Sequence, residues 1–185
     1  MLEASDLRKG VTFELDGELY RVLDYQHNKV GRGGATVRVR VRNLRNSVTV
    51  EKTFSSDDRV QDVRLDKQEV QYLYADGDLY HFMDVETYEQ PVLSADLLGD
   101  YVNYLTDGMT VTLLTHDGEA IDVELPVTVD MEVVHADPGF AGDTATGATK
   151  EVTVSTGLKV QTPLFVHEGD VIRVDTRTGN YLTRV

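Results

Sequence analysis

The chain has 185 residues, of which 41% are hydrophobic and 27% are charged, a composition typical of a folded globular protein. It contains no cysteine, which excludes disulfides, thiolate metal sites and a cysteine nucleophile. The formal net charge of −14 argues against nucleic acid as a partner. No run approaches the about 18 apolar residues of a membrane span, and the opening MLEASDLRKG lacks the apolar core of a signal peptide. A cytoplasmic location without membrane association is therefore expected.

The charge is divided unevenly along the chain. Residues 1–64 carry 12 basic and 10 acidic side chains, residues 65–128 carry 1 and 14, and residues 129–185 carry 5 and 8. This asymmetry indicates three units with different surfaces. No acidic residue occurs between Asp24 and Glu51, where six cations fall: Lys29, Arg32, Arg38, Arg40, Arg42 and Arg45. This stretch is either a solvated strand face or a local phosphate-binding surface.

Short strands dominate the elements expected in chain order. Asp16-Gly17, Asp76-Gly77 and Asp117-Gly118 are hairpin turn signals, and each lies between two apolar runs. Within 37–42, valines alternate with arginines, which predicts a strand with Val37, Val39 and Val41 on its core face. The strands expected are 11–14, 19–23, 37–41, 70–74, 79–83, 110–114, 120–125, 171–175 and 181–184.

Helix signals are few. Ser5 is expected to cap one turn that Gly10 ends, and Ser94 to cap a short helix that Gly99 weakens. Many short strands with turns between them favour an all-β chain of three small barrels. The charge blocks predict domains at 1–64, 65–127 and 128–185.

The segment 29–35, KVGRGGA, is the most distinctive motif. Lys29 begins it, and Gly31, Gly33 and Gly34 permit a tight, exposed hairpin tip on which Arg32 stands without a bulky neighbour. It matches neither the Rossmann glycine spacing nor a P-loop. A plain turn with an incidental arginine and a phosphate cradle both remain open from these residues alone.

Other constellations give weaker signals. The five histidines lack the spacing of zinc ligands, so no metal site is expected. Asp84, Glu86 and Glu89 leave a glycosidase-like acid pair open as an enzymatic alternative. Four tyrosines of the acidic block, residues 65–128, could stack on bases or pack in a core: Tyr72, Tyr74, Tyr80 and Tyr88.

The chain resembles the bacterial elongation factor P family along essentially its whole length. The segments that carry the resemblance are LRKG (7–10), YQHNKVGRGGA (25–35), VEKTF (50–54), YLY (72–74), FMD (82–84), ETYEQ (86–90), GDT (142–144), PLFV (163–166) and DTRTG (175–179). The resemblance implies an N-terminal SH3-like (KOW-like) barrel followed by two OB-fold barrels, in an L-shaped arrangement that resembles tRNA. It also implies a factor without enzymatic activity or cofactor of its own, which binds the ribosome between the P and E sites and relieves stalling at consecutive prolines.

Site roles follow from the resemblance position by position. Arg32 occupies the family's tip position near the end of P-site tRNA, supported by Lys29, Gly31, Gly33 and Gly34. Arg38, Arg40 and Arg42 are expected on the backbone of rRNA or tRNA, and Gly142, Asp143 and Thr144 near the E-site codon. The implied partners are 23S and 16S rRNA, ribosomal proteins and peptidyl-tRNA, with the factor acting as a monomer.

The tip residue is modified in many family members, so an enzyme that acts on Arg32 is a further candidate partner. Loops of the family that bear rhamnose have asparagine after the arginine, whereas Gly33 follows Arg32 here, which predicts an unmodified arginine. A general single-stranded RNA-binding OB protein is the alternative to a ribosomal factor. It would need basic, aromatic OB faces, whereas residues 65–128 hold one lysine and no arginine.

Overall fold

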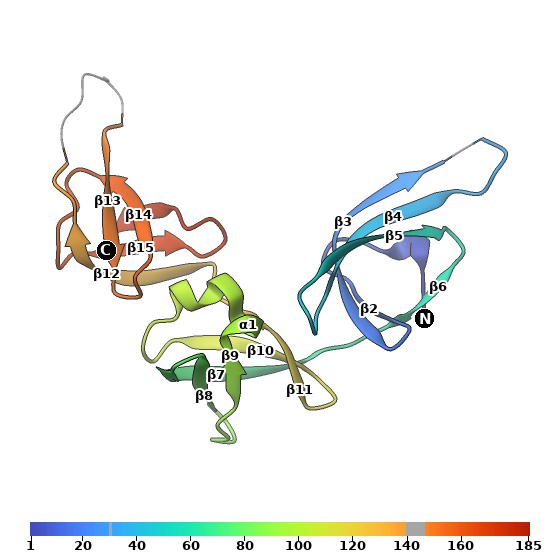
Figure 1. The fold of residues 1–185 in the computed structure, drawn as a ribbon, viewed down its shortest axis with the longest axis horizontal. Helices are drawn as coiled ribbons and strands as arrows, with labels where there is room; N and C mark the ends of the chain where they lie inside the picture. The colour runs from blue at the N-terminus through green and yellow to red at the C-terminus, as the bar shows by residue number, and fades with distance from the viewer. Residues whose placement is uncertain (30, 140–146) are drawn as a thin grey trace. The chain divides into compact units, whose positions relative to one another are not determined.

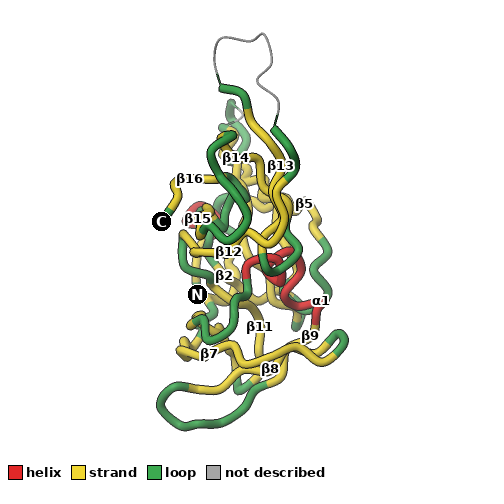
Figure 2. Tube along the Cα trace, turned by 90° about the vertical axis from the view of Figure 1, so that its left-hand side faces the viewer, coloured by secondary structure: helices red, strands yellow, loops and turns green. Residues whose placement is uncertain are grey.

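The computed structural model describes residues 1–29, 31–139 and 147–185 (Figure 1). Strands dominate these residues, and the helical segments are short (Figure 2). The strands form three antiparallel sheets of six, five and five strands. The prediction of an all-β chain is therefore confirmed.

The first sheet has the strand order β1-β6-β2-β3-β4-β5. On β4 the residues Val37, Val39 and Val41 are buried, as the alternation predicted, and they pack with Phe13 and Val22. The elements of this sheet are β1 (Leu2–Glu3), the 3-10 turn η1 (Ala4–Asp6), β2 (Thr12–Leu15), β3 (Glu18–Asn28), β4 (Thr36–Asn43), β5 (Thr49–Ser55) and β6 (Arg59–Asp62).

The first turn is not capped by Ser5, contrary to expectation. η1 covers Ala4–Asp6 and has no side-chain cap, and the Ser5 hydroxyl instead faces a Glu3 carboxylate oxygen at 3.5 Å. The Ala4 amide donates to the Asp58 carbonyl at 2.7 Å, so pairing with the β6 region decides where the turn begins. A long-range contact therefore overrides the local capping signal.

Two of the predicted aspartate-glycine turns adopt the backbone that tight hairpins need. Asp16 and Gly17 have φ of 52° and 79°, and Asp117 and Gly118 have φ of 50° and 78°. Positive φ at both central residues matches the right-handed twist of the flanking strands. The first turn joins β2 and β3 in register from Leu15 with Glu18, and the second joins the neighbouring strands β10 (Thr110–His116) and β11 (Glu119–Glu124) of the second sheet.

The second sheet has the order β11-β10-β7-β8-β9 and carries the main helical segment. Ser94 caps this segment as predicted, because its hydroxyl accepts from the Leu97 amide at 3.3 Å. Gly99, with φ of 54°, ends the α-helix, and the chain continues as a 3-10 helix. The remaining elements are β7 (Asp66–Asp76), β8 (Leu79–Asp84), β9 (Val92–Ser94), α1 (Ala95–Leu98) and η2 (Gly99–Tyr104).

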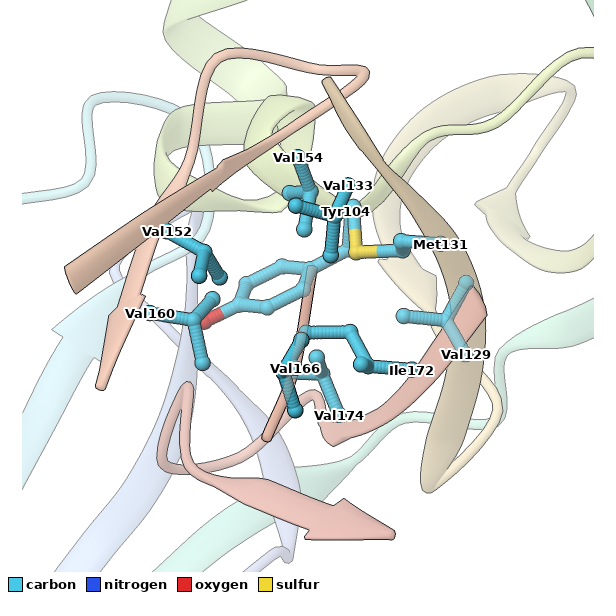
Figure 3. Close-up of a cluster of buried hydrophobic side chains, with 10 residues drawn as sticks. All are labelled: Tyr104, Val129, Met131, Val133, Val152, Val154, Val160, Val166, Ile172 and Val174. Atoms are coloured by element: carbon cyan, nitrogen blue, oxygen red, sulfur yellow. The ribbon is translucent and has the colours of Figure 1, made fainter. Parts of the chain in front are cut away.

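The third sheet has the order β14-β13-β12-β15-β16. Its core includes Tyr104, which comes from η2 and projects among the valines, Met131 and Ile172 of the sheet (Figure 3). Burial, followed by the negative charges of Asp100 and Asp175, raises the pKa of Tyr104. The strands are β12 (Thr128–Ala136), β13 (Thr149–Val154), β14 (Lys159–Pro163), β15 (Val171–Asp175) and β16 (Tyr181–Arg184).

The chain divides into two compact units. One comprises residues 1–67 with 114–122, and the other comprises 68–113 with 123–185. In the first unit Ile121 packs with Leu19, Leu44 and Val63, and Arg21 forms a hydrogen-bonded ion pair with Asp122. Among the described residues, no helix is long and apolar enough to cross a membrane.

Candidate nucleic-acid interface

The β3–β4 hairpin presents the KVGRGGA motif at its tip. Its strands pair from Tyr20 with Asn43 to Asn28 with Thr36, and the tip projects beyond the rest of the sheet (Figure 1). Gly31 has φ of 40°, and a Cβ added there or at Gly34 would meet no atom within 4 Å. The glycines therefore keep the surroundings of the tip open rather than fill a packed space.

Arg32 and Lys29 are exposed on this tip. Among the described residues, none forms a hydrogen bond or ion pair with either side chain. A guanidinium remains protonated at cellular pH and presents five N–H donors in a plane. Arg32 is thus positioned to bind a phosphate or hydroxyl that approaches from outside, and it cannot serve as a general base. Val30 lies outside the described residues.

The two faces of the hairpin differ in chemistry. A bulge between Val22 and Asp24 shifts the register, so that Asp24 and Gln26 lie opposite Arg40 and Arg38 on the outer face. Tyr25 and His27 lie opposite Val39 and Val37 on the core face. The arginines predicted to contact RNA backbone therefore share one face of the sheet.

The three arginines of β4 have different surroundings. Arg38 forms an ion pair with Glu51 of β5, with 3.3 Å between Nε and Oε1. Arg40 is exposed and lies opposite both Asp24 and Glu51. Arg42 is half-buried and lies opposite Arg21, whose guanidinium is held by Asp122. The interpretation from sequence did not foresee these acids, because their proximity depends on the strand register.

A second cluster at the hairpin was also not foreseen. Arg8 Nη1 donates to the Ser5 and Leu7 carbonyls at 2.8 and 2.9 Å and lies 3.1 Å from His27 Nε2. Its guanidinium carbon stands 5.0 Å from the centre of the Tyr25 ring, which meets the His27 ring edge-on at 5.4 Å. Arg8 thus joins the segment after η1 to the core face of the hairpin.

Arg45 does not join the arginine face. Its Nη1 donates to the Gly17 carbonyl at 2.8 Å, and its Nε lies 3.8 Å from Glu119 Oε1. The acid-free stretch 25–50 therefore divides into a hairpin tip, a strand face and one arginine that holds a neighbouring turn.

The other predicted site lies beyond what can be described. Gly142, Asp143 and Thr144 fall in 140–146, outside the described residues. The neighbouring Lys150 on β13 is 8% exposed. The described residues contain no group of three or more histidines and carboxylates suited to a metal ion.

The tyrosines of the acidic block divide between packing and exposure. Tyr72 is buried, and burial, followed by the charges of Tyr80 and Asp107, raises its pKa. Tyr74 is exposed but stacks on His81, with ring centres 4.4 Å apart. Tyr88 is also exposed. Tyr72 therefore belongs to a core, whereas Tyr74 keeps one ring face available to a partner.

Asp84 has a structural role in the same block. It is 5% exposed and accepts hydrogen bonds from the Glu86 and Thr87 amides at 2.8 and 2.9 Å and from Gln68 at 2.9 Å. The hydrogen bond from the Thr87 amide, followed by that from Glu86, lowers the pKa of Asp84. A glycosidase acid needs a raised pKa, so Asp84 does not suit that role.

Comparisons with known proteins match all three parts of the chain. Family models described as "Elongation factor P (EF-P) KOW-like domain", "Elongation factor P (EF-P) OB domain" and "Elongation factor P, C-terminal" match residues 3–60, 65–123 and 129–184. The KOW-like and OB descriptions agree with the barrel folds that the resemblance implied.

Relatives and solved structures agree with these matches. Proteins named elongation factor P from Thermoanaerobacter sp. (strain X514) and Acetivibrio thermocellus are 49% and 47% identical over 185 residues, which cover all of both chains. A structure titled eukaryotic translation initiation factor 5A from Methanococcus jannaschii shares the fold, with a TM-score of 0.54 and 24% identity over 68% of this chain and 90% of its own. The chain therefore belongs to the elongation factor P family and is a translation elongation factor.

Proposed function

We propose that this factor binds the ribosome between the P and E sites and stimulates peptide-bond formation at consecutive prolines, with Arg32 at the end of P-site tRNA. The observation that carries the proposal is the exposed Arg32 side chain on a projecting, glycine-flanked hairpin, where no described residue competes for it. The resemblance to the family, which implies a tip residue near the peptidyl-transferase centre, supports the choice of this residue.

The proposed mechanism is positioning rather than chemistry. Proline is a constrained, poorly reactive nucleophile, so peptide-bond formation with proline is slow. It becomes slower still when the P-site tRNA leaves the geometry that this attack requires. Arginine binds phosphate and 2′-hydroxyl groups and stacks on bases, so Arg32 can hold the tRNA end in place. Fixing the reactants in an attack-ready geometry lowers the entropic part of the barrier. The peptidyl transferase remains the ribosome, and the factor needs no cofactor or general base.

The distribution of charge supports a ribosomal site over free RNA. The hairpin is basic, whereas residues 65–128 carry 14 acids against one lysine and repel phosphate. Binding then depends on contacts that the assembled ribosome offers together: rRNA and tRNA at Arg38, Arg40 and Arg42, and ribosomal proteins elsewhere. We place a monomer in the cytoplasm at this site, with domains 1–64, 65–127 and 128–185.

A crosslink from the tip tests the placement. A photoreactive amino acid at position 32 is incorporated and irradiated on ribosomes that carry P-site tRNA. The proposal predicts crosslinks to the 3′ end of that tRNA, and the same probe at exposed Asp62 on β6 is the control. Crosslinks from position 32 to ribosomal RNA alone would contradict the proposal.

Free RNA binding separates this function from the alternative. The exposed Tyr74 ring favours a single-stranded RNA-binding protein, since base stacking uses such rings. The acidic block predicts weak binding to random single-stranded RNA, and firm, salt-sensitive binding to ribosomes with P-site tRNA. Tight binding to random RNA at physiological salt, lost in a Tyr74→Ala variant, would favour the alternative.

A further inference from the structure

Asp24 and Glu51 are the two acids that bound the acid-free stretch in the sequence, and the fold brings both beside one arginine. On the β3–β4 ladder Asp24 pairs with Arg40, and on the β4–β5 ladder Arg40 pairs with Glu51. Residues directly opposite in adjacent strands share a face, with their Cβ atoms about 4.5–5.5 Å apart. Arg40 is therefore flanked by a carboxylate on each side of its strand.

Glu51 also contacts the next arginine on this face. The 3.3 Å separation between Arg38 Nε and Glu51 Oε1 is an ion pair, and the two side chains are 52% and 60% exposed. Exposed ion pairs contribute little net stability, because water solvates both charges and salt screens them. A phosphate can therefore replace the Glu51 carboxylate on Arg38 at small cost.

The same residues line a shallow pocket of about 240 Å³. Its walls are Asp24, Tyr25, Gln26, Arg38, Arg40 and Glu51. The guanidinium groups and the Gln26 amide are donors, which suits an anion with several acceptor oxygens. Glu51 accepts from one of these donors at Arg38, whereas Asp24 Oδ1 accepts from the Tyr25 amide at 2.9 Å and lies opposite Arg40 on the neighbouring strand. Arg32 differs in this respect, since it lies beyond the paired residues of β3 and β4, where no described carboxylate stands opposite it.

We infer that this pocket is a subsite for an RNA phosphodiester and that Glu51 and Asp24 act as built-in competitors that hold its affinity down. The inference rests on the proposed function, because it takes the β4 arginines to contact RNA backbone. In the free factor Glu51 pairs with Arg38, and Asp24 and Glu51 lie opposite Arg40 without a described ion pair, so passing RNA meets negative charge beside both arginines. On the ribosome, other contacts raise the effective concentration of the phosphate, and the phosphate displaces the carboxylates.

Neutral, nearly isosteric substitutions test the inference. Glu51→Gln, Asp24→Asn and the double variant are compared with wild type for binding to a labelled oligouridine over a range of salt concentrations. Each single change is expected to tighten binding by about 1.4- to fivefold, the range that exposed ion pairs span. The slope of log affinity against log salt should steepen by about 0.7 for each arginine that gains a phosphate.

Asp62→Asn is the matched control, because it makes the same charge change in the first unit. Asp62 is exposed on β6, and β2 and β3 lie between β6 and β4. It changes the net charge by one without removing a carboxylate beside Arg38 or Arg40. The slope of log affinity against log salt should therefore not change. If Glu51→Gln and Asp24→Asn behave like Asp62→Asn, the carboxylates do not compete with phosphate and the inference is wrong. Thermal melts of each variant verify that it is folded.

An arginine variant distinguishes failure of the inference from failure of the proposed function. Arg38→Ala combined with Arg40→Ala should weaken binding to ribosomes and reduce its salt dependence. If that variant binds ribosomes like wild type, the arginine face does not contact backbone and the proposed role of these residues fails. If it weakens ribosome binding while the neutralised acids change nothing, only the competition inference fails.

Discussion

Arg8 and His27 meet near the tip end of the β3–β4 ladder, with 3.1 Å between Arg8 Nη1 and His27 Nε2. An arginine is always a donor, so His27 accepts through this nitrogen. Arg8 also donates to two carbonyls of its own segment, which fixes the guanidinium in one place. The contact therefore joins the beginning of the chain to the strand that leads to Arg32.

Arg8→Ala should loosen the hairpin without unfolding the domain. The hydrogen bonds and the contact with the Tyr25 ring are lost at an exposed position, so we expect a loss of about 0.5–1.5 kcal/mol in the free energy of unfolding. Amide hydrogen exchange of residues 25–28 should accelerate, whereas exchange in β2 should not. Arg59→Ala, at an exposed site on β6, is the control. Unchanged protection of the hairpin would mean that Arg8 does not brace it.

Tyr104 is expected to be essential for the stability of the C-terminal barrel. It is 8% exposed and belongs to the core that the third sheet encloses (Figure 3). Tyr104→Ala should cost about 3–5 kcal/mol in the free energy of unfolding, as for other large aromatic side chains removed from cores. Denaturant titration measures this loss, and the nearly isosteric Tyr104→Phe is the control. A loss below 1 kcal/mol, roughly that of a surface change, would contradict the role.

The raised pKa of Tyr104 adds a dependence on alkaline pH. A phenol whose pKa is raised in the folded state contributes stability that is complete below the unfolded value of about 10 and is lost as the pH rises through the folded value. Wild type should therefore lose stability above about pH 10 more steeply than Tyr104→Phe. Parallel curves for the two proteins would exclude this contribution.

Asp84 should produce the opposite dependence at acid pH. Its pKa is lowered in the folded state by the Thr87 and Glu86 amides, so its contribution is present above the unfolded value of about 3.9 and disappears as the pH falls through the folded value. Asp84→Asn should be less stable than wild type at neutral pH, and the difference should shrink in acid, as the pH falls below the unfolded value of about 3.9 and through the folded value. Urea titrations at both pH values measure it, with exposed Glu86→Gln as the control. If the stability difference persists in acid, it comes from the geometry of the Asp84 side chain and not from its charge.

Local patterns predicted the elements better than the contacts between them. Alternation in 37–42 predicted the faces of β4, and Asp-Gly pairs predicted turns, of which those at Asp16 and Asp117 have the positive φ of tight hairpins. These features depend on neighbours in the sequence. Glu51, Arg8 and Tyr104 act through strand register or through packing against distant segments, which a single sequence does not specify. Ser5 shows the same limit, because pairing near Asp58 overrides its capping signal.

Much of the candidate site was accessible from the sequence because it consists of a local motif. Gly31 and Gly34 border an open tip, and Arg32 is exposed there, as the motif indicated. The bulge between Val22 and Asp24 was not predictable from the alternation of apolar residues. That bulge decides which of the following residues face the arginines and which face the core.

Arg32 is expected to carry no modification in the native host. Gly33 and Gly34 follow it, whereas the rhamnose-bearing loops of the family have asparagine directly after the arginine. Intact-mass spectrometry of protein purified from the native host should give the mass of the unmodified sequence, and peptide mapping should give an unmodified peptide around residue 32. An added deoxyhexose on that peptide would contradict the prediction.

Translation of a proline run by the Arg32→Ala variant tests the central claim most directly. The change removes an exposed side chain, so the melting temperature should stay close to that of wild type. It also removes a charge-assisted contact worth about 1.5–3 kcal/mol, which corresponds to about a 10- to 150-fold slower positioned step. In vitro translation should therefore stall on Pro-Pro-Pro templates with this variant and proceed normally on templates without proline runs, while Lys29→Ala serves as a charge-matched control with a smaller effect. Full rescue of the Pro-Pro-Pro template by Arg32→Ala would contradict the account.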